Sequence, residues 1–104
     1  MDISVLILYS RVGCCLCEGL EERLQTIPLD SLLPPLELLV IDIDAAEVPD
    51  RERSLFDQKV PVMFLASRDL KKRIELPRVS PRLDNERLLV WLQQNTMKTL
   101  GITK

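Results

Sequence analysis

The 104-residue sequence contains no histidine, and this absence excludes several kinds of active site at once. Ser-His-Asp triads, Cys-His nucleophile pairs, histidine-ligated zinc and H-E-x-x-H sites all need an imidazole. Glycine is scarce as well. Gly13, Gly19 and Gly101 form neither a G-x-G-x-x-G motif nor a phosphate-binding loop. The chemistry of this chain must therefore use other residue types.

Aromatic residues and long apolar runs are also scarce. Aromatics make up 4% of the chain and its isoelectric point is about 5.1, so we expect no nucleic-acid partner. No apolar run approaches the roughly 20 residues that span a bilayer. Asp2 stands where a secretion signal carries Lys or Arg, and Ile3–Tyr9 is short for the apolar core of such a signal. We therefore expect a soluble, cytoplasmic protein that does not contact a membrane.

The charges are unevenly distributed along the chain, whose length fits one domain over residues 1–104. Residues 1–57 hold 12 acidic and 4 basic groups, whereas residues 58–104 hold 4 acidic and 10 basic groups. Most of these basic residues are close in sequence: Arg68, Lys71, Lys72, Arg73, Arg78, Arg82 and Arg87. We interpret them as a solvated strand edge and helix face, with a docking surface for an anionic partner as the alternative.

Cysteine occurs only in the segment Cys14-Cys15-Leu16-Cys17. Cys14 and Cys17 form a C-x-x-C pair, which in a strand–helix context indicates a dithiol that cycles between reduced and oxidised forms. Residues three apart on a helix share a face, with Cα atoms roughly 5 to 5.5 Å apart, as a disulfide requires. Cys14 and Cys15 are too close for a usual disulfide, and Cys15 and Cys17 point to opposite sides. We therefore expect any disulfide to join Cys14 to Cys17.

The apolar patterning predicts the element order β-α-β-α-β-β-α. The expected strands are Ile3–Tyr9, Leu36–Ile43, Pro61–Ala66 and an alternating segment from Leu70 to Leu76. The expected helices run from Cys14 to just before Pro28, over Val48–Gln58 with Leu55 and Phe56 inward, and onward from an N-cap at Asp84. In this last helix the expected buried stripe is Leu88, Trp91 and Leu92. The first β-α-β unit should be a parallel crossover and the later β-β a hairpin, which gives an α/β fold: a four-stranded mixed sheet with helices on both faces.

This order, the C-x-x-C at the first strand-to-helix turn, and Val60-Pro61 entering the third strand together resemble the thioredoxin superfamily. Within it, the chain is most similar to a small glutaredoxin-like protein, over roughly residues 3–95. The resemblance implies a thioredoxin-like fold and a cis Val60-Pro61 peptide beside the cysteines. Two features depart from glutaredoxins. The usual Cys-Pro-Tyr-Cys is Cys-Cys-Leu-Cys here, and residues 76–82 lack the paired glycine that helps to hold glutathione.

The position of the motif predicts different roles for its three thiols. Cys14 begins a helix near Arg11, where backbone N–H groups and the helix dipole favour a thiolate, so we expect it to be the nucleophile. Cys17 lies on the apolar stripe of the helix and should be buried, which suits a resolving cysteine that closes the disulfide. Cys15 lies on the polar side, and we expect it, like Arg11, to be auxiliary.

The resemblance also implies where substrate binds. The Val60 backbone, next to Pro61, would pair with an extended substrate. Arg11, Lys59 and Arg78 would pair with carboxylates such as those of glutathione. We expect no tightly bound cofactor, with glutathione as a possible co-substrate of weak affinity because the glycine pair is missing. The expected partners are protein disulfides or small-thiol mixed disulfides, and the expected oligomeric state is a monomer.

The sequence thus predicts a glutaredoxin-like thiol–disulfide oxidoreductase that acts in cell redox homeostasis. One alternative is a soft-metal carrier that holds copper or zinc, or an iron–sulfur cluster bridged between two chains. Copper carriers with this motif have a methionine where Val12 stands, and closed zinc sites need four ligands, whereas the chain offers three thiols. We therefore assign no metal site. The other alternative is a redox-inert interaction module with a thioredoxin-like fold.

Overall fold

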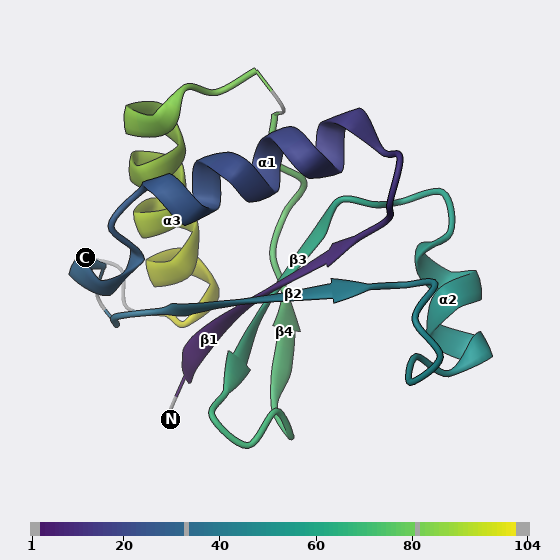
Figure 1. The fold of residues 1–104 in the computed structure, drawn as a ribbon. Coiled ribbons are helices and arrows are strands. Elements are labelled where there is room, and N and C mark those ends of the chain that lie inside the picture. Colours follow the sequence, from purple (N-terminus) through teal and green to yellow (C-terminus); the bar gives the residue numbers. More distant parts are fainter. Residues whose placement is uncertain (1–2, 33, 81, 102–104) are drawn as a thin grey trace.

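The computed structural model describes residues 3–32, 34–80 and 82–101. The strands are β1 (Ile3–Ser10), β2 (Glu37–Asp42), β3 (Val62–Ser67) and β4 (Arg73–Glu75). The helices are α1 (Cys15–Thr26), the short 3-10 helix η1 (Leu29–Ser31), α2 (Asp50–Phe56) and α3 (Asn85–Thr99). Figure 1 shows their arrangement and confirms the predicted order of strands and α-helices. None of the helices in the described part of the chain is both long enough and apolar enough to cross a membrane.

The four strands form one mixed sheet in the order β2-β1-β3-β4. β1 pairs in parallel with β2, and antiparallel pairing joins β1 to β3 and β3 to β4. As a central strand, β1 is covered on both faces, which explains why its sequence is a continuous apolar run rather than an alternating one. Because β1 and β2 are parallel, their carboxyl ends lie at the same end of the sheet. The cysteine segment follows β1 at this end.

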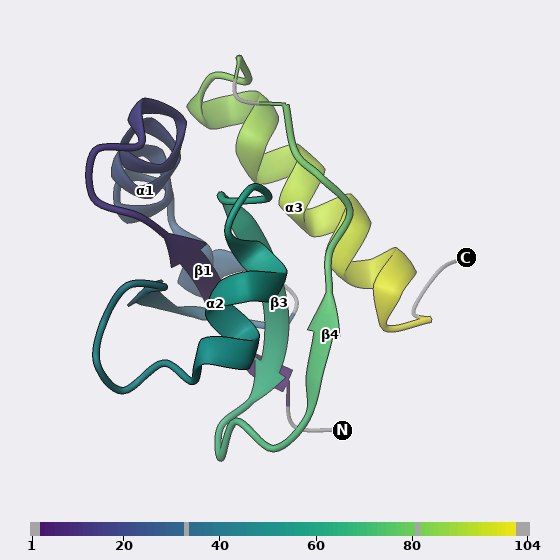
Figure 2. The same ribbon diagram turned by 90° about the vertical axis from the view of Figure 1, so that its right-hand side faces the viewer.

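Helices cover both faces of the sheet, as predicted (Figures 1 and 2). Leu6 and Leu8 of β1 pack with the buried residues of α1 and α3 on one face. Ile7 and Tyr9 of the same strand pack with Phe56 of α2 on the other face. Side chains alternate between the two faces along a strand, so β1 supplies both halves of the core. This is the α/β arrangement of a thioredoxin-like fold.

The β3–β4 connection differs from its prediction, because β4 is only three residues long and does not begin at Leu70. Leu70 has a φ of 63° and donates its N–H to the Ser67 carbonyl at 2.9 Å, so it belongs to a turn. Asp69 stabilises this turn, since its carboxylate accepts hydrogen bonds from the Ser67 hydroxyl and the Lys71 N–H. The alternating pattern began inside this turn, and the predicted strand was therefore too long.

The predicted burial of two adjacent residues in α2 was half wrong. Phe56 is buried, with 5% of its surface exposed, whereas Leu55 is 57% exposed. Successive residues on a helix point about 100° apart, so this short helix cannot direct both side chains into the core. In α3 the predicted N-cap is confirmed, since the Asp84 carboxylate accepts the Arg87 N–H at 2.9 Å. Leu88 and Leu92 are buried as predicted, whereas Trp91 of the same predicted stripe is only partly buried.

Candidate active site

A tight turn carries the chain from β1 into α1 and places Cys14 at the N-cap of the helix. Gly13 has a φ of 87°, a conformation that glycine adopts without the strain of a Cβ. The Glu18 carboxylate accepts the Gly13 N–H at 3.2 Å, and the Arg11 carbonyl accepts the Cys14 N–H at 3.2 Å. These two hydrogen bonds hold the backbone of the turn on its strand side and on its helix side, and they thereby fix the backbone that carries Cys14.

The three cysteines are free thiols with different surroundings. Cys14 is partly exposed, and its sulfur accepts the backbone N–H of Cys17 at an N···S distance of 3.3 Å. Cys15 is exposed on the first residue of the helix. Cys17 is completely buried, as its place on the stripe with Leu20 predicts. The molecule therefore presents one accessible sulfur that receives a backbone N–H and one sulfur enclosed behind it.

The environment of Cys17 keeps its thiol protonated. Burial is the main cause and raises the pKa of the Cys17 thiol to about 11, and a hydrogen bond with the Cys14 sulfur acts in the same direction. A hydrogen bond from the backbone of Arg11 and one from the Ser10 side chain act in the opposite direction. At neutral pH Cys17 is therefore a thiol, which is the weakly nucleophilic form of a cysteine.

This raised pKa predicts a loss of stability at alkaline pH. The folded-state pKa lies above the ordinary value of 9.0, so the contribution of the neutral thiol is fully present below pH 9 and is lost as pH rises toward 11. Urea unfolding of the reduced protein should show a free energy of unfolding that falls over this interval. Cys17→Ala is the control and should lack this part of the fall. Equal pH slopes for the two proteins would contradict the assignment.

The Val60-Pro61 peptide is cis, as the resemblance implied. The Val60 N–H donates to the Phe56 carbonyl at 3.2 Å, so the backbone of Val60 is not entirely free to pair with a substrate. Among the residues that the structure describes, no backbone N–H donates to the Val60 carbonyl. Pro61 itself lines a cavity of about 200 Å³ together with Leu16 of the C-x-x-C motif, which places the proline beside the cysteine helix.

Lys59 and Arg78 line a second cavity together with this proline. A guanidinium nitrogen of Arg78 donates to the Lys59 carbonyl at 3.1 Å, and both side chains are exposed. Within residues 3–32, 34–80 and 82–101, neither cation forms an ion pair. The structure thus brings together four of the residues predicted to bind substrate, Lys59, Val60, Pro61 and Arg78.

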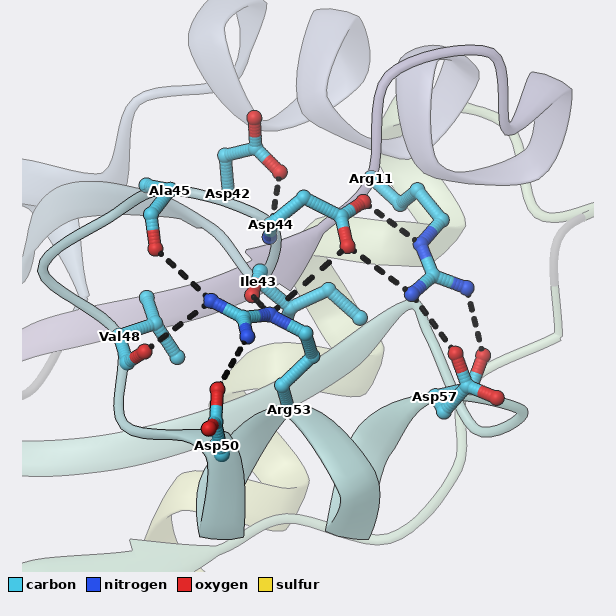
Figure 3. Close-up of polar contacts among 9 residues, drawn as sticks. All are labelled: Arg11, Asp42, Ile43, Asp44, Ala45, Val48, Asp50, Arg53 and Asp57. Atoms are coloured by element: carbon cyan, nitrogen blue, oxygen red, sulfur yellow. Dashed lines mark hydrogen bonds and ion pairs between the residues drawn. The ribbon is translucent and has the colours of Figure 1, made fainter.

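The side chain of Arg11 has a different environment from these cations. Its guanidinium binds both carboxylate oxygens of Asp44, at 2.8 and 3.1 Å, and also Asp57, at 2.7 Å to the carboxylate and 3.1 Å to the carbonyl (Figure 3). Hydrogen bonds to the two aspartates raise the pKa of Arg11, and in turn hydrogen bonds from Arg11 lower the pKa of Asp44. The backbone of Arg11 faces the cysteines, while its charged group ties the turn before Cys14 to the loop after β2 and to the end of α2.

Arg53 extends this network into the loop between β2 and α2. It donates to the carbonyls of Ile43, Ala45 and Val48 and pairs with Asp50 (Figure 3). Sequence reasoning did not identify Asp44, Asp57 or Arg53 as parts of the site. The sequence did contain a signal for the pairing of Arg11 with Asp44. Arg11 follows β1 and Asp44 follows β2, and the carboxyl ends of parallel strands lie close together. The pairing with Asp57 has no comparable sequence signal.

Among the described residues, no group of three or more His, Cys, Asp or Glu side chains has an arrangement that could hold a metal ion.

Comparison with known proteins agrees with this fold and motif. The family model for the Glutaredoxin-like domain (DUF836) matches residues 5–93. The chain belongs to this family. The glutaredoxin-like domain is also similar to a solved structure described as that of a malarial protein, with 16% identity and a TM-score of 0.56, over 88% of this chain and 94% of that one. At this identity the likeness shows a shared fold.

A second solved structure, the X-ray structure of a structural genomics target from X. campestris, is 24% identical to the glutaredoxin-like domain. The match covers 86% of this chain and 96% of the X. campestris chain, with a TM-score of 0.48. A search of curated proteins found no significant match.

Proposed function

We propose that this glutaredoxin-like domain is a thiol–disulfide oxidoreductase that uses Cys14 and Cys17 as its redox pair. The observation that carries the proposal is the contrast between the two sulfurs. The Cys14 sulfur is partly exposed at a helix N-terminus and accepts a backbone N–H, whereas Cys17 is fully buried and protonated. A nucleophile needs access and stabilisation of its negative charge, while a resolving thiol is best kept unreactive until a mixed disulfide forms next to it.

The reaction proceeds in two exchanges. The Cys14 thiolate attacks one sulfur of the substrate disulfide, so that a new S–S bond to Cys14 forms, the substrate S–S bond breaks, and the released thiolate takes up a proton. Cys17 then attacks the Cys14 sulfur and gives up its proton, which the departing substrate sulfur takes up. This second step forms the Cys14–Cys17 disulfide and releases the second substrate thiol. Two electrons pass from the dithiol to the substrate, and an external thiol reductant restores the dithiol.

The reduction potential of the Cys14–Cys17 couple tests this proposal. We expect titration in glutathione and dithiothreitol buffers to give a single transition with a slope of about 30 mV per decade, as for two electrons. Mass spectrometry after alkylation would count the free thiols at each potential. Cys15→Ser should retain the transition, and Cys17→Ser should lose it. A protein whose cysteines all remain alkylated across the range would contradict the proposal.

The structure also bears on the choice between glutathione and protein substrates. Val79 is buried and its side chain lines the cavities at Pro61, in the stretch where glutaredoxins have glycine. Pro81, which sequence reasoning expected to remove a backbone donor from the glutathione clamp, lies outside the described residues. A side chain at position 79 occupies space that a backbone needs to approach a small ligand closely, so we propose weak glutathione affinity.

We therefore expect glutathionylated proteins to be reduced no faster than intramolecular protein disulfides. The measurement compares both substrates under one electron donor, at equal concentrations of reacting disulfide. Val79→Gly is the informative variant, since it should raise the rate with the glutathionylated substrate. Wild-type rates that favour the glutathionylated substrate by about an order of magnitude would restore an ordinary glutaredoxin specificity.

A further inference from the structure

Two cavities adjoin each other beside the cysteine helix. One has a volume of about 200 Å³ and is lined by Leu16, Leu20, Pro61, Arg78 and Val79. The other has a volume of about 240 Å³ and extends from Pro61 along the start of β3 and the segment after β4. Pro61, Arg78 and Val79 line both cavities. A ligand that crosses the proline would therefore contact the two cavities in succession.

The first cavity is apolar and partly open. Apart from Arg78, all of its lining side chains are hydrocarbon, and Leu16, inside the C-x-x-C motif, is 51% exposed. Val12, two residues before the nucleophile, is 83% exposed. An engineered cavity of about 150 Å³ holds a benzene molecule, so this space has room for one aliphatic side chain. Such a side chain would cover apolar surface that now meets water.

The second cavity carries a net positive charge. Lys59, Arg78 and Glu75 are the ionisable residues in its lining. Arg78 is held at the boundary of the two cavities by its hydrogen bond to the Lys59 carbonyl, and neither it nor Lys59 has a carboxylate partner within the part of the chain that is described. A guanidinium with unused donors binds a carboxylate well, because its planar group matches the two carboxylate oxygens.

We infer that the substrate is a polypeptide whose reacting cysteine is flanked by an aliphatic residue and an acidic residue. The aliphatic side chain fills the cavity at Leu16, and the carboxylate meets Arg78 and Lys59. This inference rests on the proposed oxidoreductase function and specifies the substrate of that same site. Glutathione supplies carboxylates but no aliphatic side chain, so it satisfies only the charged half of the groove.

Four peptides test the inference. Each carries one cysteine as a mixed disulfide with thionitrobenzoate, so the leaving group is constant and its release is coloured. The residues flanking the cysteine are Leu and Glu, Leu and Gln, Ala and Glu, or Ala and Gln. We expect the Leu and Glu peptide to have the highest kcat/KM, with a loss of about tenfold when Leu becomes Ala, as for a hydrophobic pocket. We expect a loss of about threefold when Glu becomes Gln, as for an exposed charge pair.

Protein variants link each preference to its cavity. Leu16→Ala should lose the preference for leucine and keep that for glutamate, whereas Arg78→Gln should do the reverse. Arg68→Gln is the matched control for charge, because Arg68 is an exposed residue beyond β3 that lines neither cavity. It should change neither preference.

The outcomes separate the inference from the function on which it rests. Equal Cys14-dependent rates for all four peptides, or a preference at only one of the two positions, would overturn the inference and leave the oxidoreductase function intact. An equal loss of glutamate preference in Arg78→Gln and Arg68→Gln would also overturn it, because the effect would then be long-range. No release above the rate of a Cys14→Ser protein would refute the oxidoreductase function itself.

Discussion

The Cys14→Ser variant is expected to lose at least about 100-fold of the thiol–disulfide exchange rate, whereas Cys15→Ser should stay within about threefold of the wild type. A serine hydroxyl is almost entirely protonated at neutral pH and does not attack a disulfide. Cys14 is the N-cap whose sulfur accepts a backbone N–H, while Cys15 is an exposed residue on the helix surface. The measurement is the rate at which each protein reduces a disulfide substrate while an external dithiol regenerates the protein. The alkylation rate of each protein is measured beside it.

Cys17→Ser provides the complementary result. This variant should complete the first exchange and accumulate a mixed disulfide, which intact-mass spectrometry would detect on Cys14. The assignment of the nucleophile would be wrong if the fast-alkylating thiol disappeared in Cys15→Ser and persisted in Cys14→Ser. Since Cys14 and Cys15 are adjacent, the comparison controls for general effects of losing a thiol from this segment.

The second large effect concerns stability. Phe56→Ala should lower the free energy of unfolding by about 3 to 5 kcal/mol, as expected for a buried aromatic. The Phe56 ring stacks on Tyr9 with centroids 4.5 Å apart and meets Phe64 edge-on at 5.8 Å. Phe56 is the one buried residue of the seven-residue helix α2, and it packs in the core cluster with Ile7 and Tyr9 of β1. Denaturant unfolding with an unchanged m-value would measure the loss.

Leu55→Ala is the matched control, since it removes a large apolar side chain one position earlier in the same helix. Leu55 is mostly exposed, so we expect a change within about 0.5 kcal/mol. A similar loss for both variants would mean that α2 packs with a different rotation about its axis. The pair of variants thus tests a place where the apolar pattern and the structure disagree about which side chain is inside.

Most of the architecture follows from features that are local in the sequence. The continuous apolar run of Ile3–Tyr9 predicts a strand that is covered on both faces, as the central strand β1 is. The N-cap at Asp84 and the stripe through Leu88 and Leu92 predict α3 for similarly local reasons. The cysteine pair and Val60-Pro61 indicated the site itself through their resemblance to a known family. The family match over residues 5–93 confirms the resemblance itself, while the roles of these residues stay a prediction.

The features that sequence reasoning missed depend on tertiary geometry or on turn chemistry. The hydrogen bonds of Asp69 decide where the hairpin turns, and a period-2 pattern does not register them. The contact of Arg11 with Asp57 joins residues 46 positions apart and depends on how α2 lies against the sheet. No local pattern encodes that orientation. Sequence reasoning placed Arg11 close to Cys14, and the backbone of Arg11 does contact Cys14. It did not predict that the guanidinium of Arg11 would bind Asp44 and Asp57.

The order of the strands also places unpaired positive charge on one side of the cysteine turn. β2 and β4 are opposite edges of the sheet, and the cysteine turn follows β1 between them. On the β2 side the carboxylate of Asp44 is already paired with Arg11. Lys59 and Arg78, which lie before β3 and after β4, have no carboxylate partner in the part of the chain that is described. An anionic substrate would therefore be drawn toward the side of β3 and β4 before contact, and salt would weaken this attraction.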